Sequence, residues 1–278
     1  MHKKYIKGRK MALLQINHKS SAVKTNLVLN ISIPDITEED PRPIHERKVL
    51  WLLHGLSADG STWVRYGNAD WVSRELGVII IMPSGDRSFY VNMDNGQNYF
   101  SYLTEELPEW IDARFKFNLN RDNSLIAGLS MGGYGAFMAA LRRPDLYCEA
   151  ASFSGLLAIQ MLQLPEFAHH DPILMKEMDM VFGGLDKLPG SIYDPAFLLQ
   201  EIAKTPEKCP RLYASIGLND NLLPTNRIFA QQASALGLPL IYIEDEGEHT
   251  WPFWHKYLPI WLKFVLGDSA KEGQHGED

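Results

Sequence analysis

One serine in the sequence lies in a motif that could make it a nucleophile. Residues 128–132 read Gly-Leu-Ser-Met-Gly, which matches the pattern G-x-S-x-G with Ser130 at its centre. This pattern is typical of a sharp turn between a strand and a helix, and here an apolar run precedes it and a helix-like segment follows it. Glycines suit such a turn because side chains there would collide with neighbouring backbone. We therefore predict that Ser130 attacks a carbonyl carbon. The alternative is a glycine-rich turn without chemistry.

A serine hydroxyl is a weak nucleophile and needs a base. His249 is the candidate, because it follows the apolar run 240–243 and a turn at 246–248, and precedes a helix-like segment. The other histidines that we considered have less suitable places: His54 at a strand end, His255 within a helix, and His169 and His170 in an irregular region. Adjacent residues such as 169–171 do not have the spacing of a metal site, so no metal is expected.

The third member of such a site is a carboxylate that orients the imidazole. Asp220 is the candidate, because it directly follows the apolar run 212–217 and gives the chain order Ser, Asp, His. The alternatives from the sequence are Glu244, Asp245 and Glu246, which lie at a strand end just before His249. Asp220 could also be an ordinary cap of the helix expected after Pro224.

Acyl transfer also requires donors for the oxygen that becomes negatively charged. The backbone N–H of Met131, at the start of the helix after Ser130, is one candidate. The loop after the strand expected at residues 49–53 reads His54-Gly55-Leu56, so the N–H of Leu56 is the second candidate. The alternative for this loop is a plain turn after a strand.

Short apolar runs that end in turn residues recur along the chain, as expected of strands buried on both faces of a parallel sheet. They occupy residues 49–55, 78–83, 124–128, 149–153, 212–217 and 240–243. Helix-like segments lie between them, for example residues 99–115, where apolar positions fall three or four apart. This alternation predicts an α/β fold with a mostly parallel central sheet and helices on both faces. Residues 26–34 alternate apolar and polar, which suits an antiparallel edge strand.

We expect a single domain over residues 11–267. Residues 156–210 are rich in proline and too long for a simple crossover, so they are interpreted as a small helical insertion over the carboxyl edge of the sheet. Residues 1–10 form a basic extension, and residues 268–278 a polar tail. Gly133 and Gly135, within the helix after Ser130, suggest that this helix approaches the sheet closely.

The composition excludes several classes of protein. The net charge of −7, without a basic cluster in the body of the chain, argues against a nucleic-acid partner. No apolar segment of membrane-spanning or signal-peptide length follows the basic start, which predicts a cytoplasmic protein without a membrane partner. The two cysteines, Cys148 and Cys209, form no disulfide framework or metal-binding pattern.

Four separated runs resemble the bacterial tributyrin esterases of the wider esterase D group. They are WLLHGLSADGSTW at 51–63, AGLSMGGYGAF at 127–137, ASFSG at 151–155 and EHTWPFW at 248–254. The same group includes S-formylglutathione hydrolases, feruloyl esterases and, more distantly, mycolyltransferases. The resemblance covers about residues 11–266. It implies an α/β-hydrolase fold that cleaves short-chain acyl esters without a cofactor, often as a homo-oligomer.

Carried over by position, the resemblance implies that Ser130 is the nucleophile, Asp220 the acid and His249 the base, with Leu56 and Met131 as oxyanion donors. Similar proteins usually have G-x-x-D-x-L around the acid, and residues 217–222 keep that frame. The insertion and residues 84–96 match less clearly. An acyltransferase or an S-formylglutathione hydrolase-like thioesterase could use the same residues, and a non-catalytic binding protein could retain the fold.

Several aromatic residues fall near the predicted catalytic edge and could line an apolar substrate site. The candidates for substrate binding are Trp63, Tyr90 and Trp251, and Phe89 and Trp254 lie close to them in the sequence. Aromatic packing is the alternative for each. The expected ligand is a small acyl ester.

Overall fold

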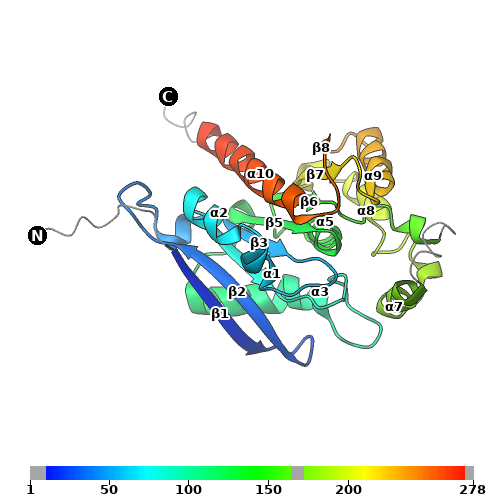
Figure 1. Cartoon of the computed structure of the whole chain (residues 1–278), viewed down its shortest axis with the longest axis horizontal. Helices are drawn as coiled ribbons and strands as arrows, with labels where there is room; N and C mark the ends of the chain where they lie inside the picture. The colour runs from blue at the N-terminus through cyan, green and yellow to red at the C-terminus, as the bar shows by residue number, and fades with distance from the viewer. Residues whose placement is uncertain (1–10, 164–171, 273–278) are drawn as a thin grey trace, which may run out of the picture.

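The fold is built on an eight-stranded sheet with the order β1-β2-β4-β3-β5-β6-β7-β8 (Figure 1). The computed structural model describes residues 11–163 and 172–272, with side chains described up to residue 267. Strands β3 to β8 are parallel, and β1 and β2 are antiparallel. The strands are β1 (Met11–Lys19), β2 (Asn26–Pro34), β3 (Val49–Leu53), β4 (Ile79–Pro83), β5 (Ser124–Leu129), β6 (Glu149–Phe153), β7 (Arg211–Gly217) and β8 (Leu240–Asp245). The α/β-hydrolase fold expected from the sequence is confirmed.

Helices cover both faces of the sheet, and each face has its own apolar core. One core contains residues of α4 (Leu107–Phe115), α5 (Met131–Arg142), α8 (Pro195–Ile202) and α9 (Leu223–Ala235). The other contains residues of α1 (Thr62–Arg65), α2 (Ala69–Leu76) and α10 (Trp251–Glu272). Strand β3 shows how this works, because Trp51 faces the first core while Leu50 and Leu52 face the second. Strands buried on both faces explain the continuous apolar runs of the sequence.

The antiparallel start of the sheet differs from the prediction. Strand β2 has the predicted bounds but is not an edge strand, because β1 pairs along its whole length and forms the edge. The polar face of β2 is covered, and Ser32 donates a hydrogen bond to Asp70 at the start of α2. The sequence did not predict β1, which buries only one of its faces and exposes Leu13.

The helix expected at residues 99–115 is interrupted. It consists of α3 (Tyr99–Ser101), a π-helical turn (Tyr102–Glu106) and α4. Pro108 lacks an N–H and cannot donate the usual hydrogen bond to residue 104, and a wider turn absorbs this defect.

The insertion contains α7 (Pro172–Phe182), α8 and short 3₁₀ turns, at residues Ile159–Gln163, Leu185–Lys187 and Pro206–Lys208. Arg87, in the loop after β4, forms an ion pair with Glu177 of α7. Helix α8 packs beside α5 and α9 and so extends the layer of helices on that face of the sheet. Residues 164–171 of the predicted insertion lie outside the described residues, as do residues 1–10 and 273–278.

Helix α10 extends beyond residue 267, where the predicted domain ended. It begins at Trp251 and runs through Gly267 to Glu272, so residues 268–272 belong to the helix and not to a separate tail. Figure 1 shows α10 (red) on the same side of the sheet as α2.

A buried ion pair anchors the segment between β2 and β3. The side chain of Arg47 is fully buried, and its Nη1 donates to Asp40 Oδ2 at 2.7 Å and to the carbonyl of Gly77 at 3.0 Å. Asp40 also accepts from Arg42. Hydrogen bonds from Arg42 and then Arg47 hold the pKa of the Asp40 carboxyl well below its usual range, against the opposing effect of burial.

We expect Asp40→Asn to lower the free energy of unfolding by about 3 kcal/mol, because it leaves a buried guanidinium without its counterion. Urea denaturation at pH 7 measures this loss. The Asp40 pKa is depressed in the folded state, so the stabilisation is complete above the unfolded pKa of about 4. It is lost as the pH falls through the folded value, and the two proteins should therefore converge in acid. Glu46→Gln is the control, because this exposed carboxylate lies only near the exposed His45 ring. Equal stability of wild type and Asp40→Asn at pH 7 would contradict this account.

Candidate active site

Ser130 lies on a strained turn between β5 and α5. Its φ of 54° and ψ of −118° are rare for a residue with a side chain. A Cβ atom on Gly128 would lie 2.3 Å from the carbonyl oxygen of Gly132, and one on Gly132 would lie 2.5 Å from that of Leu53. The backbone N–H of Ser130 donates to Phe153 of β6 at 2.9 Å. The glycines of the motif therefore allow the close packing that holds the serine in this conformation.

The three predicted side chains form one hydrogen-bonded chain. Nε2 of His249 lies 2.9 Å from Oγ of Ser130, and Nδ1 of His249 lies 2.9 Å from Oδ2 of Asp220. Asp220 is buried, and its other oxygen accepts from the N–H of Leu222 at 2.9 Å. The carboxylate can therefore hold the imidazole with Nδ1 protonated and Nε2 free to accept the serine proton. The structure brings together residues that are 29 and 119 positions apart in the chain.

The loops after β7 and β8 hold the acid and the base together. The N–H of Asn219 donates to the carbonyl of Gly247 at 3.0 Å, and a Cβ on Gly217 would lie 2.4 Å from that same oxygen. Trp254 of α10 stands edge-on to the His249 ring at a centroid distance of 5.2 Å. Trp254 is in turn held by a hydrogen bond from Nε1 to Ser154 Oγ at 3.1 Å. Ser154 lies in the run 151–155, but its contact with Trp254 and its positive φ of 55° are visible only in the structure.

Four of the competing acids and bases have other partners, namely Glu244, Asp245, His54 and His255, whereas His169 and His170 lie outside the described residues. Glu244 pairs with Arg227 and accepts from Tyr242. Asp245 pairs with Lys256 and accepts from Tyr257. For Glu246 the bond is made by the backbone N–H, which donates to Oδ1 of Asp245, and not by the carboxylate. His255 contacts the carbonyl of Tyr66, and His54 is buried among backbone groups.

Both predicted oxyanion donors are available. Leu56 follows β3 and Met131 begins α5, and within the described residues neither N–H donates to another group. The N–H of Met131 also lies at the positive end of the α5 dipole, which favours a developing negative charge. The two donors come from neighbouring strands, because β3 pairs with β5 in parallel register.

The aromatic residues proposed for substrate binding have different places. Trp63 is 1% exposed and its Nε1 donates to the carbonyl of Leu53 at 2.9 Å. Tyr90 is 2% exposed and its hydroxyl contacts the backbone of His54. Both side chains are therefore packed within the fold, not on a cavity wall. Trp251 is half-buried, stands edge-on to Trp63 at 5.2 Å and remains a candidate for substrate contact. Phe89 is buried against Tyr134 and Phe182.

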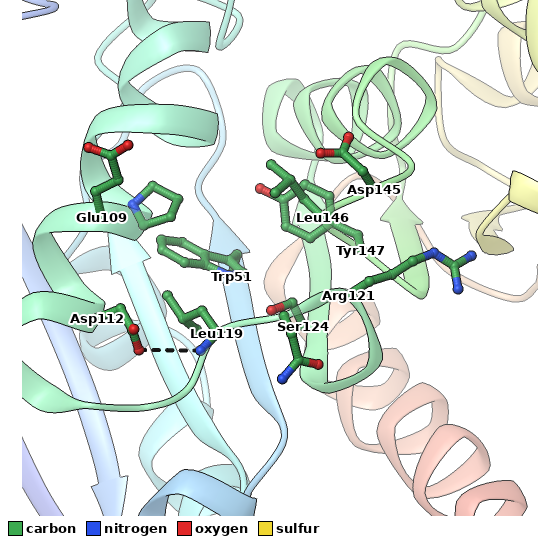
Figure 2. A pocket seen from close by; sticks show the side chains of 11 residues that line it. Trp51, Glu109, Asp112, Leu119, Arg121, Ser124, Asp145, Leu146 and Tyr147 are labelled. Atoms are coloured by element: carbon green, nitrogen blue, oxygen red, sulfur yellow. Dashed lines mark hydrogen bonds between the residues drawn. The ribbon is translucent and has the colours of Figure 1, made fainter.

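Of two cavities in the fold, one lies beside a predicted site residue and the other lies away from the site. A polar cavity of about 390 Å³ lies against Leu56 and is also lined by Asp59, Arg65, Asp86 and Arg87. Another, of about 260 Å³, lies at the amino ends of β5 and β6 and is lined by Trp51, Ser124 and Tyr147 among others (Figure 2). The second cavity contains none of the predicted site residues, since these follow the carboxyl ends of the strands.

In the described part of the chain, no three His, Cys, Asp or Glu side chains lie together in a way that could hold a metal ion. Among the helices in the described ranges, none has the length and hydrophobicity needed to cross a membrane.

An eight-stranded, mostly parallel sheet with a Ser–His–Asp chain at its carboxyl edge defines a member of the α/β-hydrolase class. Comparison with known families narrows this class. The model of the putative esterase family matches residues 20–263, and the chain belongs to that family, whose members are hydrolases that act on esters.

Individual relatives agree with this placement. An acetyl esterase of Caldicellulosiruptor saccharolyticus is 30% identical over 254 residues, which cover 89% of this chain and 96% of the relative. The crystal structure of an S-formylglutathione hydrolase from Staphylococcus aureus is similar with a TM-score of 0.79 and 28% identity, covering 92% of this chain and 98% of that one. A fluorophosphonate-binding serine hydrolase of Staphylococcus aureus gives a TM-score of 0.80 and 27% identity, over 91% and 98% of the two chains.

Proposed function

We propose that the chain is a serine carboxylesterase that hydrolyses short-chain acyl esters through an acyl-enzyme intermediate. The observation that carries this proposal is the hydrogen-bonded chain from Ser130 through His249 to Asp220. No cofactor or metal is required for the chemistry described below.

In the first half of the reaction, Oγ of Ser130 attacks the ester carbonyl while Nε2 of His249 takes its proton. Asp220 stabilises the imidazolium that forms. The carbonyl oxygen becomes an anion and accepts hydrogen bonds from the N–H groups of Leu56 and Met131. Collapse of this tetrahedral intermediate breaks the bond to the alcohol oxygen, which leaves with the proton from His249. The acyl group remains on Ser130.

In the second half, water replaces the alcohol. His249 takes a proton from water as it attacks the acyl carbon, and the second tetrahedral intermediate releases the acid and returns the proton to Ser130. The polar cavity is lined by Leu56, one of the two proposed oxyanion donors, so it can take a polar part of the substrate.

The short acyl chain is supported by the acetyl esterase to which this chain is 30% identical. A specific observation favours a second candidate, a thioesterase acting on S-formylglutathione. The structure of such a hydrolase aligns with 92% of this chain. The two candidates share the residues and the mechanism, and differ in the leaving group.

Hydrolysis of p-nitrophenyl acetate, butyrate, octanoate and palmitate tests the acyl preference. We expect kcat/KM to be highest for acetate and butyrate and to fall for the longer chains. Thioester hydrolysis of S-formylglutathione should be measured in the same preparation. A kcat/KM for this thioester far above those for the esters would favour the second candidate. Product analysis with a competing alcohol distinguishes the esterase from an acyltransferase, because an esterase releases mainly free acid. Absence of activity on every substrate would contradict both candidates.

A further inference from the structure

His54 connects β3 to the loop that contains Leu56, and both nitrogens of its buried ring are engaged. Nδ1 lies 2.7 Å from the carbonyl oxygen of Gly55, and Nε2 lies 2.8 Å from the backbone nitrogen of Gly85. The side chain is 1% exposed. The ring therefore lies between the oxyanion loop and the loop that follows β4.

These two contacts fix the protonation of the ring. The N–H of Gly85 can only donate, so Nε2 must be the unprotonated nitrogen that accepts. Nδ1 then carries the hydrogen and donates to the carbonyl of Gly55. Burial lowers the pKa of His54, which keeps the ring neutral as this pattern requires.

The contact with Gly55 also determines the direction of a catalytic donor. The carbonyl of Gly55 and the N–H of Leu56 belong to one planar trans peptide, so they point in opposite directions. When the His54 ring fixes the direction of the Gly55 carbonyl, it therefore also fixes the opposite direction of the Leu56 N–H.

Tyr90 fixes the backbone of His54. Its hydroxyl accepts from the N–H of His54 at 2.9 Å and donates to the carbonyl of His54 at 3.1 Å. Burial raises the pKa of Tyr90, so the hydroxyl keeps the proton that it donates. Two glycines make room for the phenol ring of Tyr90. A Cβ at Gly85 would lie 2.2 Å from this ring, and one at Gly135 would lie 2.5 Å from it.

We propose that His54 and Tyr90 are positioning residues that hold the Gly55–Leu56 peptide with the Leu56 N–H directed at the substrate oxyanion. This inference rests on the proposed acyl-transfer function and extends it to two residues that do not touch the substrate. It predicts that their hydrogen bonds affect the transition state more than the bound substrate.

Two isosteric substitutions of His54 separate its contacts. In His54→Asn the amide nitrogen takes the place of Nδ1 and can still donate to Gly55, whereas in His54→Gln an amide oxygen can replace Nε2 but the donor to Gly55 is lost. We expect His54→Gln to lower kcat about 100-fold with little change in KM, which is the effect of losing one oxyanion donor. His54→Asn should recover most of this loss.

Tyr90→Phe provides a second route that does not alter the imidazole. It should lower kcat without changing KM, whereas Tyr147→Phe should have no effect. Tyr147 is equally buried, but its hydroxyl has no partner among the described residues. Circular dichroism and thermal unfolding show whether each variant is folded.

Affinity for butaneboronic acid is the decisive measurement. The boronate forms a tetrahedral anion on Ser130, so its Kd should rise in the same order as kcat falls. This readout needs no ester turnover, so it tests the proposal even if the natural reaction differs from the one proposed. Equal losses of kcat in His54→Asn and His54→Gln, or an unchanged boronate Kd in folded His54→Gln and Tyr90→Phe, would overturn it.

Discussion

Ser130→Ala should abolish esterase activity, with kcat for p-nitrophenyl butyrate falling by at least about 10⁴-fold. The reason is chemical, because the hydroxyl that forms the acyl-enzyme is absent while the fold is kept. The substitution also leaves the packing of the turn unchanged, because the close backbone contacts there are made at Gly128 and Gly132. Thermal unfolding should therefore change little.

Labelling by a fluorophosphonate probe supplies an independent readout. Wild type should react at Ser130, as shown by mass spectrometry of the modified peptide, and Ser130→Ala should not react. Ser234→Ala, at an exposed position of α9, is the matched control and should retain full activity and labelling. Residual activity near the wild-type value in Ser130→Ala would show that another residue is the nucleophile.

Asp220→Asn should lower kcat by about 10⁴-fold. The asparagine retains an oxygen that can accept from Leu222, so the loop should stay folded. Its amide nitrogen, however, donates to Nδ1 of His249 and forces the hydrogen onto Nε2. In that tautomer, His249 presents a donor to Ser130 and cannot accept its proton.

The competing carboxylates provide the controls for this prediction. Glu244→Gln and Asp245→Asn should retain activity within a few-fold of wild type, because their partners are Arg227 and Lys256 and not His249. A large loss in Asp245→Asn with activity retained in Asp220→Asn would reassign the acid. The steady-state rates of the three variants, measured at one pH, decide between these outcomes.

The catalytic arrangement could be predicted from the sequence because its residues follow parallel strands of the sheet. Such strands appear as short apolar runs, and their carboxyl ends meet at one edge of the sheet. Ser130, Asp220 and His249 each come after one of these runs, so their proximity follows from the topology. Strand β1 has no such signal, because the exposed polar residues Gln15, Asn17 and Lys19 interrupt its apolar run.

The roles of the aromatic residues could not be predicted in the same way. Trp63 and Tyr90 lie near the site in the sequence, but whether a ring faces a cavity or the core depends on contacts between distant segments. Tyr90 packs against Gly135 of α5, so this glycine provides room for a ring. Gly133 does approach the sheet as predicted, since a Cβ there would lie 2.6 Å from Ser152 Oγ of β6. Of the two glycines in α5, Gly133 thus allows close approach to the sheet and Gly135 makes room for Tyr90.

The cavity of Figure 2 also indicates where the protein could be engineered for durability. It lies at the amino ends of β5 and β6, whereas Leu56 and Ser130 follow the carboxyl ends of β3 and β5. Stabilising changes often reduce activity when they stiffen or reshape an active site. Side chains that fill this remote space can add packing without altering the loops that hold substrate. Heat resistance and ester preference can therefore be selected in separate libraries and then combined.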